Sequence, residues 1–439
     1  MSLLGELERN PASDPGNERN ALGVLRFITC GSVDDGKSTL IGRLLHDTRA
    51  ILQDQLAAVA RASSKRGSGE LDLSLLTDGL EAEREQGITI DVAYRYFTTG
   101  RRKFIIADTP GHEQYTRNMV TGASTAAAAV VLLDARKGLL PQSKRHLYLA
   151  QLLGIRNLIV AVNKLDLVDY SAGVFDALRA EFEQFAASLA IPNLQFVPMS
   201  ALRGDMVVER GAQLDWYRGP TLLEALEAVN VENETAARPL RFPVQYVVRA
   251  NGSSAGLPAS RGYMGRIVSG TLRPGDPVVA LPSGRRSRIR AITVLDGALD
   301  AAAAGYSVTL LLEDELDVSR GDMLADFIRP PHAARAFEAK LCWLASEPLR
   351  PQGRYLLKHT TRTVKAKFAS INYRIDVTSL GKESLAAPGA DVRMNDIVHA
   401  ALVVQQPVFA DSYAVDRATG AFILIDEASN QTVAAGMIE

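Results

Sequence analysis

The chain has 439 residues, of which 47% are hydrophobic and 23% charged, and its formal net charge is −1. This length exceeds one ordinary core and predicts two to four domains of a globular protein. The near-zero charge excludes a global positive field for nucleic acid, and the longest apolar run, residues 126–135, is too short to cross a bilayer. The two cysteines match no metal spacing and fit a reducing cytoplasm. We therefore expect a cytoplasmic protein with no nucleic-acid and no membrane partner.

Residues 1–23 are expected to form an N-terminal extension, since they lack the basic-then-apolar pattern of a targeting signal. An apolar run at Arg26–Cys30 then predicts a buried strand. "GSVDDGKS", residues 31–38, follows this strand, and "TLIGRLL" after it has the pattern of a helix. Gly-x-x-x-x-Gly-Lys-Ser between a strand and a helix is the spacing of a loop that binds phosphates.

The residue types in this loop suit contact with a nucleotide. Gly31 and Gly36 let backbone N–H groups reach phosphate oxygens, and Lys37 places an ammonium on the terminal phosphates. The hydroxyl of Ser38 can bind Mg²⁺, and the helix N-terminus adds positive potential. The expected nucleotide contacts in this segment are Gly31, Ser32, Val33, Asp34, Asp35, Gly36, Lys37, Ser38 and Thr39.

Two later segments are predicted to sense the third phosphate. In "EREQGITI", residues 83–90, Thr89 would bind Mg²⁺ through its hydroxyl and the γ-phosphate through its N–H; in isolation, this stretch also fits a charged helix end. "DTPGH" follows a predicted strand at Lys103–Ala107. Asp108 would hold Mg²⁺ through water, Gly111 would donate to the γ-phosphate, and His112 would orient the attacking water. On its own, a turn glycine beside a surface histidine explains that segment equally well.

"NKLD", residues 163–166, predicts which base is bound. Asp166 can accept hydrogen bonds from N1–H and the 2-amino group of guanine, whereas adenine offers neither donor. A charged group left unpaired costs roughly 1–3 kcal/mol or more. Asn163 would tie neighbouring loops together, and Lys164 would cover the base with its aliphatic stem. The expected ligand is therefore GTP with Mg²⁺.

Short apolar runs alternate with helical patterns up to about residue 230. Further strands are predicted at 129–134, 157–162 and 194–199, and a helix at 173–189. Ser200, Ala201 and Leu202 follow the last strand and could give N–H groups to the guanine oxygen. This alternation predicts an α/β P-loop domain over residues 24–231, with a doubly wound, mostly parallel sheet that binds ligands at the carboxyl ends of its strands.

The pattern of apolar and polar residues changes after "NVENETAARPLR", residues 230–241, which has the composition of a linker. Short alternating runs broken by glycine and proline predict two small antiparallel β-barrels, at residues 240–330 and 333–439. The histidines other than His112 match no metal-ligand spacing. They are expected to be structural or solvated.

Five motifs in this order, followed by two barrels, resemble the elongation-factor-like translational GTPase superfamily. "GSVDDGKSTLIGRLL", "LLTDGLEAEREQGITIDVAYRYF" and "DTPGHEQYTRNMVTGAST" are similar to the GTPase (large) subunits of bacterial sulfate adenylyltransferase. The resemblance implies GTP hydrolysis, with His112 as the catalytic residue and Val33 and Ile88 as an apolar gate beside it. Ordinary packing would also explain Val33 and Ile88.

The resemblance also implies a partner. A separate small catalytic subunit would make adenosine 5′-phosphosulfate and pyrophosphate from ATP and sulfate, and this chain would couple GTP hydrolysis to that step within a heterodimer. Whether heterodimers assemble further stays open. The alternative is an elongation-factor-like GTPase that binds aminoacyl-tRNA. Ser32 is modest evidence against it, because translation factors usually carry histidine at this position. An inactive scaffold is a poor third hypothesis, since every catalytic position is filled.

Overall fold

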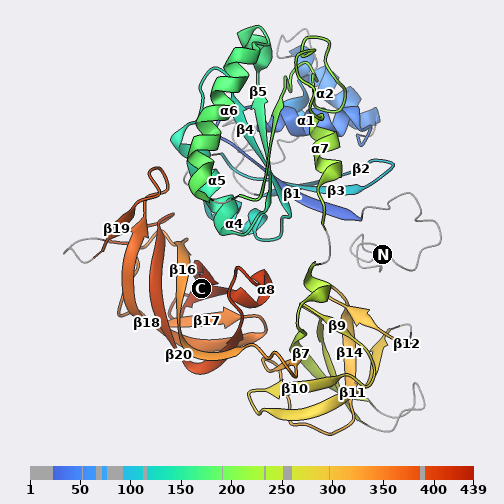
Figure 1. The fold of residues 1–439 in the computed structure, drawn as a ribbon, viewed down its shortest axis with the longest axis vertical. Helices are drawn as coiled ribbons and strands as arrows, with labels where there is room; N and C mark the ends of the chain where they lie inside the picture. The colour runs from blue at the N-terminus through green and yellow to red at the C-terminus, as the bar shows by residue number, and fades with distance from the viewer. Residues whose placement is uncertain are drawn as a thin grey trace. The chain divides into compact units, whose positions relative to one another are not determined.

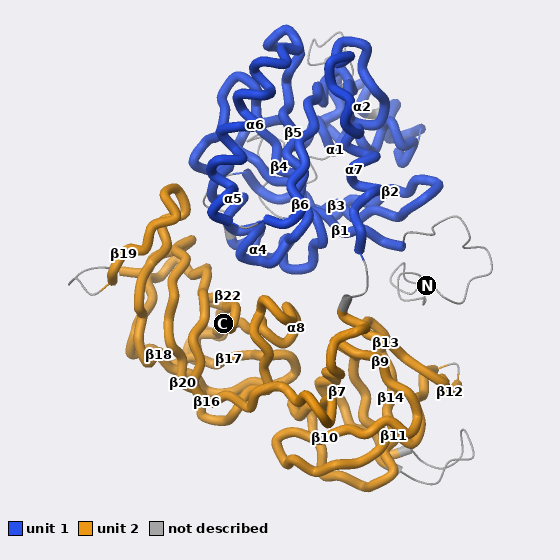
Figure 2. Tube along the Cα trace, in the orientation of Figure 1, with its two compact units in different colours: residues 1–231 blue, residues 232–439 orange. Residues whose placement is uncertain are grey.

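The computed structural model describes residues 23–51, 53–65, 72–76, 92–111, 116–189, 191–231, 234–250, 260–295, 297–385 and 391–439. The chain divides into two compact units, residues 1–231 and residues 232–439 (Figure 2). The first unit contains a mixed sheet with helices on both of its faces (Figure 1). The second unit is built from antiparallel strands.

The sheet of the first unit has the strand order β2-β3-β1-β4-β5-β6. All neighbouring pairs are parallel except β2–β3, so the predicted doubly wound, mostly parallel sheet is confirmed. Its strands are β1 (Val24–Cys30), β2 (Ala93–Thr98), β3 (Lys103–Asp108), β4 (Ala128–Asp134), β5 (Asn157–Asn163) and β6 (Asn193–Pro198). Strand β4 is buried along its whole length, which explains its continuous apolar run.

The sheet register brings the ends of the parallel strands to one edge. Thr29 pairs with Asp108 across β1 and β3, and Asp134 pairs with Asn163 across β4 and β5. Each of these four residues is polar although its strand is mostly apolar. Polar side chains therefore collect at the carboxyl edge, where an open α/β sheet binds its ligand.

The helices begin and end where local signals place them. Ser171 caps α6 by accepting from the N–H of Val174, and Thr221 forms a capping box with Glu224 at the start of α7. The helices of this unit are α1 (Lys37–Asp47), α2 (Gln53–Lys65), α4 (Thr116–Ala123), α5 (Pro141–Leu152), α6 (Ala172–Ala186) and α7 (Leu222–Ala228), with 3₁₀ turns η3 (Leu73–Leu76), η5 (Leu165–Val168) and η6 (Ala187–Leu189).

Strand β2 was not among the predicted strands. Among the described strands it pairs with β3 alone, antiparallel, at the edge of the sheet, and Tyr94 and Tyr96 on one side of it are 42% and 56% exposed. A half-exposed edge strand does not read as an apolar run, because only alternate side chains are buried. The pattern that found the buried parallel strands therefore missed this one.

The second unit contains two strand rings. In the first, the order β10-β15-β7-β8-β14-β11 closes through a β10–β11 pairing; in the second, β17-β21-β22-β16-β20-β18 closes through β17–β18. The predicted barrels are thus confirmed as closed antiparallel sheets. The strands of the first ring and its neighbours are β7 (Arg241–Ala250), β8 (Ser260–Arg266), β9 (Thr271–Leu272), β10 (Pro277–Leu281), β11 (Arg285–Val294), β12 (Gly297–Leu299), β13 (Ala302–Ala303), β14 (Ser307–Leu312) and β15 (Met323–Asp326), after the 3₁₀ turn η7 (Glu234–Ala237).

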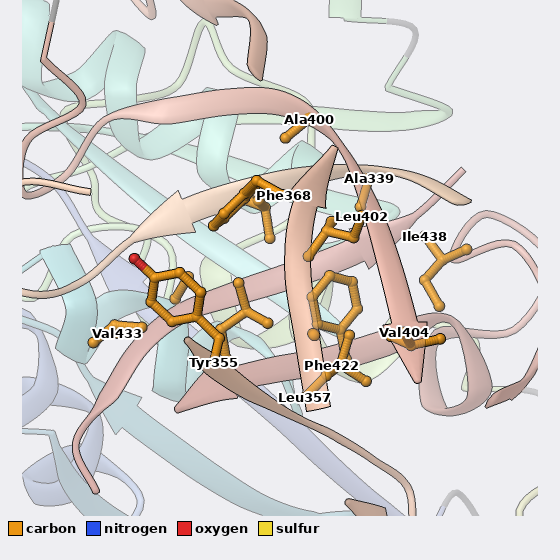
Figure 3. Close-up of a cluster of buried hydrophobic side chains, with 14 of the residues drawn as sticks. Ala339, Tyr355, Leu357, Phe368, Ala400, Leu402, Val404, Phe422, Val433 and Ile438 are labelled. Atoms are coloured by element: carbon orange, nitrogen blue, oxygen red, sulfur yellow. The ribbon is translucent and has the colours of Figure 1, made fainter. Parts of the chain in front are cut away.

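The second ring encloses its own core. Side chains from all of its strands meet there, among them Tyr355, Phe368, Leu402 and Phe422 (Figure 3). Burial of this apolar surface drives closure, and closing the ring also removes free strand edges. Its elements are β16 (His332–Trp343), β17 (Tyr355–His359), β18 (Arg362–Ile375), β19 (Lys382–Ser384), β20 (Ile397–Ala410), α8 (Arg417–Gly420), β21 (Ala421–Asp426) and β22 (Thr432–Ile438).

The two rings are joined within the second unit by a buried ion pair. The guanidinium of Arg241, on β7, donates to both carboxylate oxygens of Asp411, at 2.8 and 2.9 Å. The hydroxyl of Thr419 donates to the same carboxylate at 2.7 Å. The two-bond geometry fixes the direction of approach as well as the distance.

Candidate functional site

The glycine-rich loop lies between β1 and α1, at the carboxyl edge of the sheet. Gly36 is the N-cap of α1 with a φ of 96°, in the left-handed region that favours glycine. A Cβ atom at this position would lie 2.5 Å from Nδ2 of Asn163. Among the described residues no side chain caps α1 at Gly36. The N–H groups of its first turn and the positive end of its dipole are thus available to an anion.

The ammonium of Lys37 is folded back onto this loop. It donates to the carbonyls of Gly31 and Ser32, at 2.9 Å each, and the residue is 7% exposed. Burial lowers the pKa of Lys37, and the carboxylate of Asp108 opposes that shift. A Cβ atom at Gly111 would lie 2.5 Å from the ammonium nitrogen. The loop and the Asp-x-x-Gly segment therefore pack around one cation.

The Asp35 side chain contacts the backbone of its own loop. Its Oδ2 accepts from the N–H of Ser32 at 2.6 Å, whereas its buried Oδ1 has no hydrogen-bond partner among the described residues. Burial raises the pKa of Asp35 to about 6, although Lys37 partly offsets this. The Asp35 side chain thus stabilises the conformation of the loop through a hydrogen bond to its backbone. Of the other predicted loop contacts, Asp34 is exposed and Val33, Ser38 and Thr39 are half-buried.

Asn163, at the end of β5, joins the phosphate loop to the segment after β6. Its Nδ2 donates to the carbonyl of Asp35 at 2.8 Å, and its Oδ1 accepts from the N–H of Ala201 at 2.9 Å. The residue is 2% exposed, so water cannot replace either bond. Asn163 thereby connects the expected phosphate and base sides of the site.

Lys164 takes a left-handed conformation, with a φ of 63°, and its side chain runs back to the phosphate loop. The ammonium donates to the carbonyl of Asp34 and lies 3.0 Å from Oδ2 of Asp134. Asp166 follows in the 3₁₀ turn η5 and is half-buried. The lysine stem and the Asp166 carboxylate thus belong to one short segment at the sheet edge.

Ser200, Ala201 and Leu202 come directly after β6. The N–H of Ser200 donates to the carbonyl of Asp205 at 3.2 Å, and the N–H of Ala201 is the one that Asn163 accepts. Two of the three N–H groups therefore already bond within the protein. A guanine oxygen would meet the N–H of Leu202, or would replace Asn163 as the acceptor for Ala201.

Three predicted positions lie outside the described residues. Thr89 and Ile88 fall in the range 77–91, and His112 falls in the range 112–115. The magnesium and γ-phosphate role of Thr89, the gate role of Ile88 and the catalytic role of His112 remain predictions.

Asp134 and Arg136, which belong to none of the motifs, join the site. The guanidinium of Arg136 bonds to both oxygens of Asp134, with Nη2 2.7 Å from Oδ2 and Nε 3.0 Å from Oδ1. Burial alone would raise the pKa of Asp134, but hydrogen bonds from Arg136 and Lys164 outweigh it and hold the pKa well below its usual range. An aspartate at the carboxyl end of the apolar run "VVLLD" was the available signal.

A second cluster of metal-type ligands lies in the second unit. Ligand atoms of Glu338, His399 and Glu439 all lie within 4.8 Å of one another. Nε2 of His399 is 2.7 Å from a carboxylate oxygen of Glu439, whose other oxygen is 2.7 Å from the ammonium of Lys340. Because the Glu439 carboxylate is already paired with the Lys340 ammonium, we assign the cluster as an ion-pair network.

Within the described part of the chain, no helix combines the length and the apolar character that crossing a bilayer requires.

A family model described as the elongation factor Tu GTP binding domain matches residues 23–231, and one described as GTP-eEF1A C-terminal domain-like matches residues 336–439. A phosphate loop, an Asp-x-x-Gly segment and an Asn-Lys-x-Asp segment at one sheet edge, together with these matches, define a GTP-binding protein of the translational GTPase superfamily.

Curated relatives identify the family more narrowly. Sulfate adenylyltransferase subunit 1 of Chromobacterium violaceum is 53% identical over 94% of this chain and 86% of its own length. The protein of the same name from Shewanella oneidensis is 50% identical over 99% of this chain and 89% of its own length. The bifunctional enzyme CysN/CysC of Mycobacterium tuberculosis is 50% identical over 94% of this chain and 67% of its own length. The chain belongs to the sulfate adenylyltransferase subunit 1 family.

Proposed function

We propose that this chain is the GTP-hydrolysing regulatory subunit of a sulfate adenylyltransferase in the cytoplasm. A small catalytic subunit, with which it forms a heterodimer, makes adenosine 5′-phosphosulfate and pyrophosphate from ATP and sulfate. The observation that carries the proposal is the joining of the phosphate loop to the Asn-Lys-x-Asp segment by the two buried hydrogen bonds of Asn163, in a chain of this family. This link between the two motif segments supports the assignment of Asp166 to the base and of Lys37 to the phosphates.

In this proposal, different residues of the site bind different parts of GTP. Two loop carbonyls hold the ammonium of Lys37 in place. Because the side chain is already ordered, binding the terminal phosphates costs little further side-chain entropy. Asp166 accepts from the base edge, and the stem of Lys164, anchored on Asp134 at 3.0 Å, covers the base. Backbone N–H groups later in the loop would surround the phosphates, whereas the N–H of Ser32 already donates to Asp35.

The donor set at the phosphate end suits Mg²⁺. Ser38 offers a hydroxyl in the first turn of α1, and Asp108 offers a carboxylate, one oxygen of which accepts from the hydroxyl of Thr29 at 3.2 Å. Hydroxyl and carboxylate oxygens are the ligands that this hard cation prefers, and Thr89 would complete the set. When bound there, Mg²⁺ would supply positive charge that offsets the charge of the phosphates. The proposed role of His112 is to orient the water that attacks the γ-phosphate.

GTP hydrolysis supplies what sulfate activation lacks. The phosphoric–sulfuric anhydride lies uphill of the ATP bond that is broken to make it, so product accumulates only if a second favourable reaction is linked to the first. The γ-phosphate contacts proposed for Thr89 and Gly111 would form with GTP and be lost after hydrolysis. A partner that binds one of the two nucleotide states better would thereby be coupled to hydrolysis.

The test is the GTPase rate of the purified pair of subunits. We expect hydrolysis to accelerate when ATP and sulfate are added together, and not when either is added alone. Asp166→Asn is the matched variant: its amide should favour xanthosine over guanosine nucleotides, so the substrate-stimulated rate should follow XTP. A rate that does not respond to ATP and sulfate would contradict this proposal. Stable GTP-dependent binding of aminoacyl-tRNA would support the elongation-factor alternative instead.

A further inference from the structure

Backbone strain is concentrated next to Asp166. Three non-glycine residues in the segment 164–170 have positive φ values: Lys164 at 63°, Asp169 at 52° and Tyr170 at 49°. Such conformations are disfavoured for residues with a Cβ atom, and two in succession, at Asp169 and Tyr170, add their costs. They persist where surrounding contacts hold the backbone, and they gather at functional sites.

Tyr170 is held at three points. Its hydroxyl donates to Oδ2 of Asp205 at 2.6 Å, and its carbonyl accepts from Nε1 of Trp216 at 3.0 Å. Its N–H donates to the carbonyl of Leu165 at 2.8 Å, which closes the segment on itself around Asp166. Burial and the hydrogen bond to Asp205 raise the pKa of the Tyr170 phenol, so it stays protonated and donates.

Asp205 is in turn fixed to the other base-side segment. Its carbonyl accepts from the N–H of Ser200 at 3.2 Å, and the N–H of Gly204 donates to the carbonyl of Ser200 at 2.8 Å. A Cβ atom at Gly211 would lie only 2.2 Å from Oδ1 of Asp205, so the backbone there confines the carboxylate. The Tyr170–Asp205 hydrogen bond therefore joins the 164–170 segment to the turn that begins at Ser200.

We propose that Asp205, acting through the Tyr170 hydroxyl, is a positioning residue for recognition of guanine. The inference rests on the proposed function, because it assumes that Asp166 reads the base. The carboxylate of Asp166 discriminates only if it cannot follow a base that lacks a donor. With the Tyr170–Asp205 bond in place, the strained segment and the Ser200–Leu202 turn form one body, and Asp166 keeps a single position. Without it, the segment keeps its backbone hydrogen bonds but loses its side-chain link to that turn, and the carboxylate adapts more easily.

Tyr170→Phe removes only the hydroxyl, and Tyr217→Phe is its matched control. The Tyr217 hydroxyl donates to the carbonyl of Phe196 at 2.8 Å, is likewise half-buried, and lies in the same unit. Each variant loses one hydroxyl and one hydrogen bond, but only Tyr170 bonds to the turn after Ser200. A purely structural role predicts that the two variants behave alike.

The measurements use the full chain with a fluorescent GDP analogue and with GDP and IDP, since the hypoxanthine base of IDP lacks the 2-amino group. We expect Tyr170→Phe to speed dissociation of the GDP analogue roughly tenfold and to reduce the GDP-to-IDP affinity ratio by a similar factor. Tyr217→Phe should leave both values within about twofold of the unaltered chain. Asp205→Ala, which removes the acceptor, should move both in the same direction as Tyr170→Phe, and the double variant should add nothing further.

Wild-type dissociation and wild-type discrimination in Tyr170→Phe would overturn the inference, as would equal effects in the Tyr217→Phe control. If Tyr170→Phe does not fold, the same criteria apply to Asp205→Ala. Failure of the unaltered chain to bind GDP has a different meaning: it would contradict the proposed function itself. The two failures are thus distinguishable.

Discussion

Lowering the pH from 7 to 5 should act with opposite signs on two buried groups near the phosphate loop. Burial, with a contribution from Lys37, lowers the pKa of His146 to about 3 from 6.5. The folded state therefore favours the neutral imidazole, and the stability this contributes is lost as the pH falls below 6.5. Asp35 behaves the other way. Burial raises its pKa to about 6 from 3.8, so the stability it contributes is present at low pH and is lost as the pH rises through 6.

The magnitudes follow from these pKa values at about 1.36 kcal/mol per unit. Between pH 7 and pH 5, His146 should remove about 2 kcal/mol from the free energy of unfolding, and Asp35 should add about 1 kcal/mol. Both residues are 1% exposed, so solvent screening does not reduce these values greatly. In the unaltered chain the two effects largely cancel. Each contribution to the pH dependence of the free energy of unfolding can be measured only when the other residue is replaced.

The assay is urea unfolding of nucleotide-free protein at the two pH values. Trp216 lies in the first unit and Trp343 in the second, and the chain has no other tryptophan. A Trp343→Phe background therefore leaves a fluorescence signal from the unit that contains the site. Relative to this background, His146→Gln should retain about 2 kcal/mol more stability at pH 5, and Asp35→Asn should lose about 1 kcal/mol more. Parallel pH profiles for His146→Gln and the background would refute the reasoning from burial.

Three further predictions concern single side chains. Gly36→Ala should lower GDP affinity tenfold or more, because the new Cβ atom would lie 2.5 Å from Nδ2 of Asn163 at a φ of 96°. Arg241→Met should lower the unfolding free energy of the second unit by about 3 kcal/mol, since it leaves the carboxylate of Asp411 without its bidentate partner. His112→Ala should slow GTP hydrolysis more than tenfold while GTP affinity stays within about twofold.

Separate measurements check these outcomes. Equilibrium titration with fluorescent GDP tests the glycine variant, and unchanged affinity would show that the loop can move away from the added methyl group. Tryptophan fluorescence from the second unit tests Arg241→Met, and a transition confined to the first unit would contradict the assignment. Single-turnover hydrolysis beside a binding titration tests His112→Ala, and equal losses in both would remove its catalytic role.

The central part of the fold, and the position of the motifs at one edge of its sheet, were predictable because their signals are local. Buried parallel strands appear as continuous apolar runs, and the motifs that follow them meet at one edge in any sheet of this kind. Glycine at position 36 follows from the loop spacing alone, and the structure supplies its reason, the left-handed φ and the nearby Asn163 side chain. Asp166 was likewise a candidate from the sequence, because the residue types and spacing in "NKLD" indicate a carboxylate that can accept hydrogen bonds from guanine.

Tertiary structure alone decided the contacts between residues far apart in the chain. Asp134 reaches Lys164, and Tyr170 reaches Asp205, only through the register of neighbouring strands and the path of the turns after them. His399 likewise meets Glu338 and Glu439 because three barrel strands pair side by side. A hydrogen bond depends on tenths of an ångström, whereas a sequence pattern specifies residue types and spacing along the chain. The sequence thus determined which chemistry is present, and packing determined which groups act together.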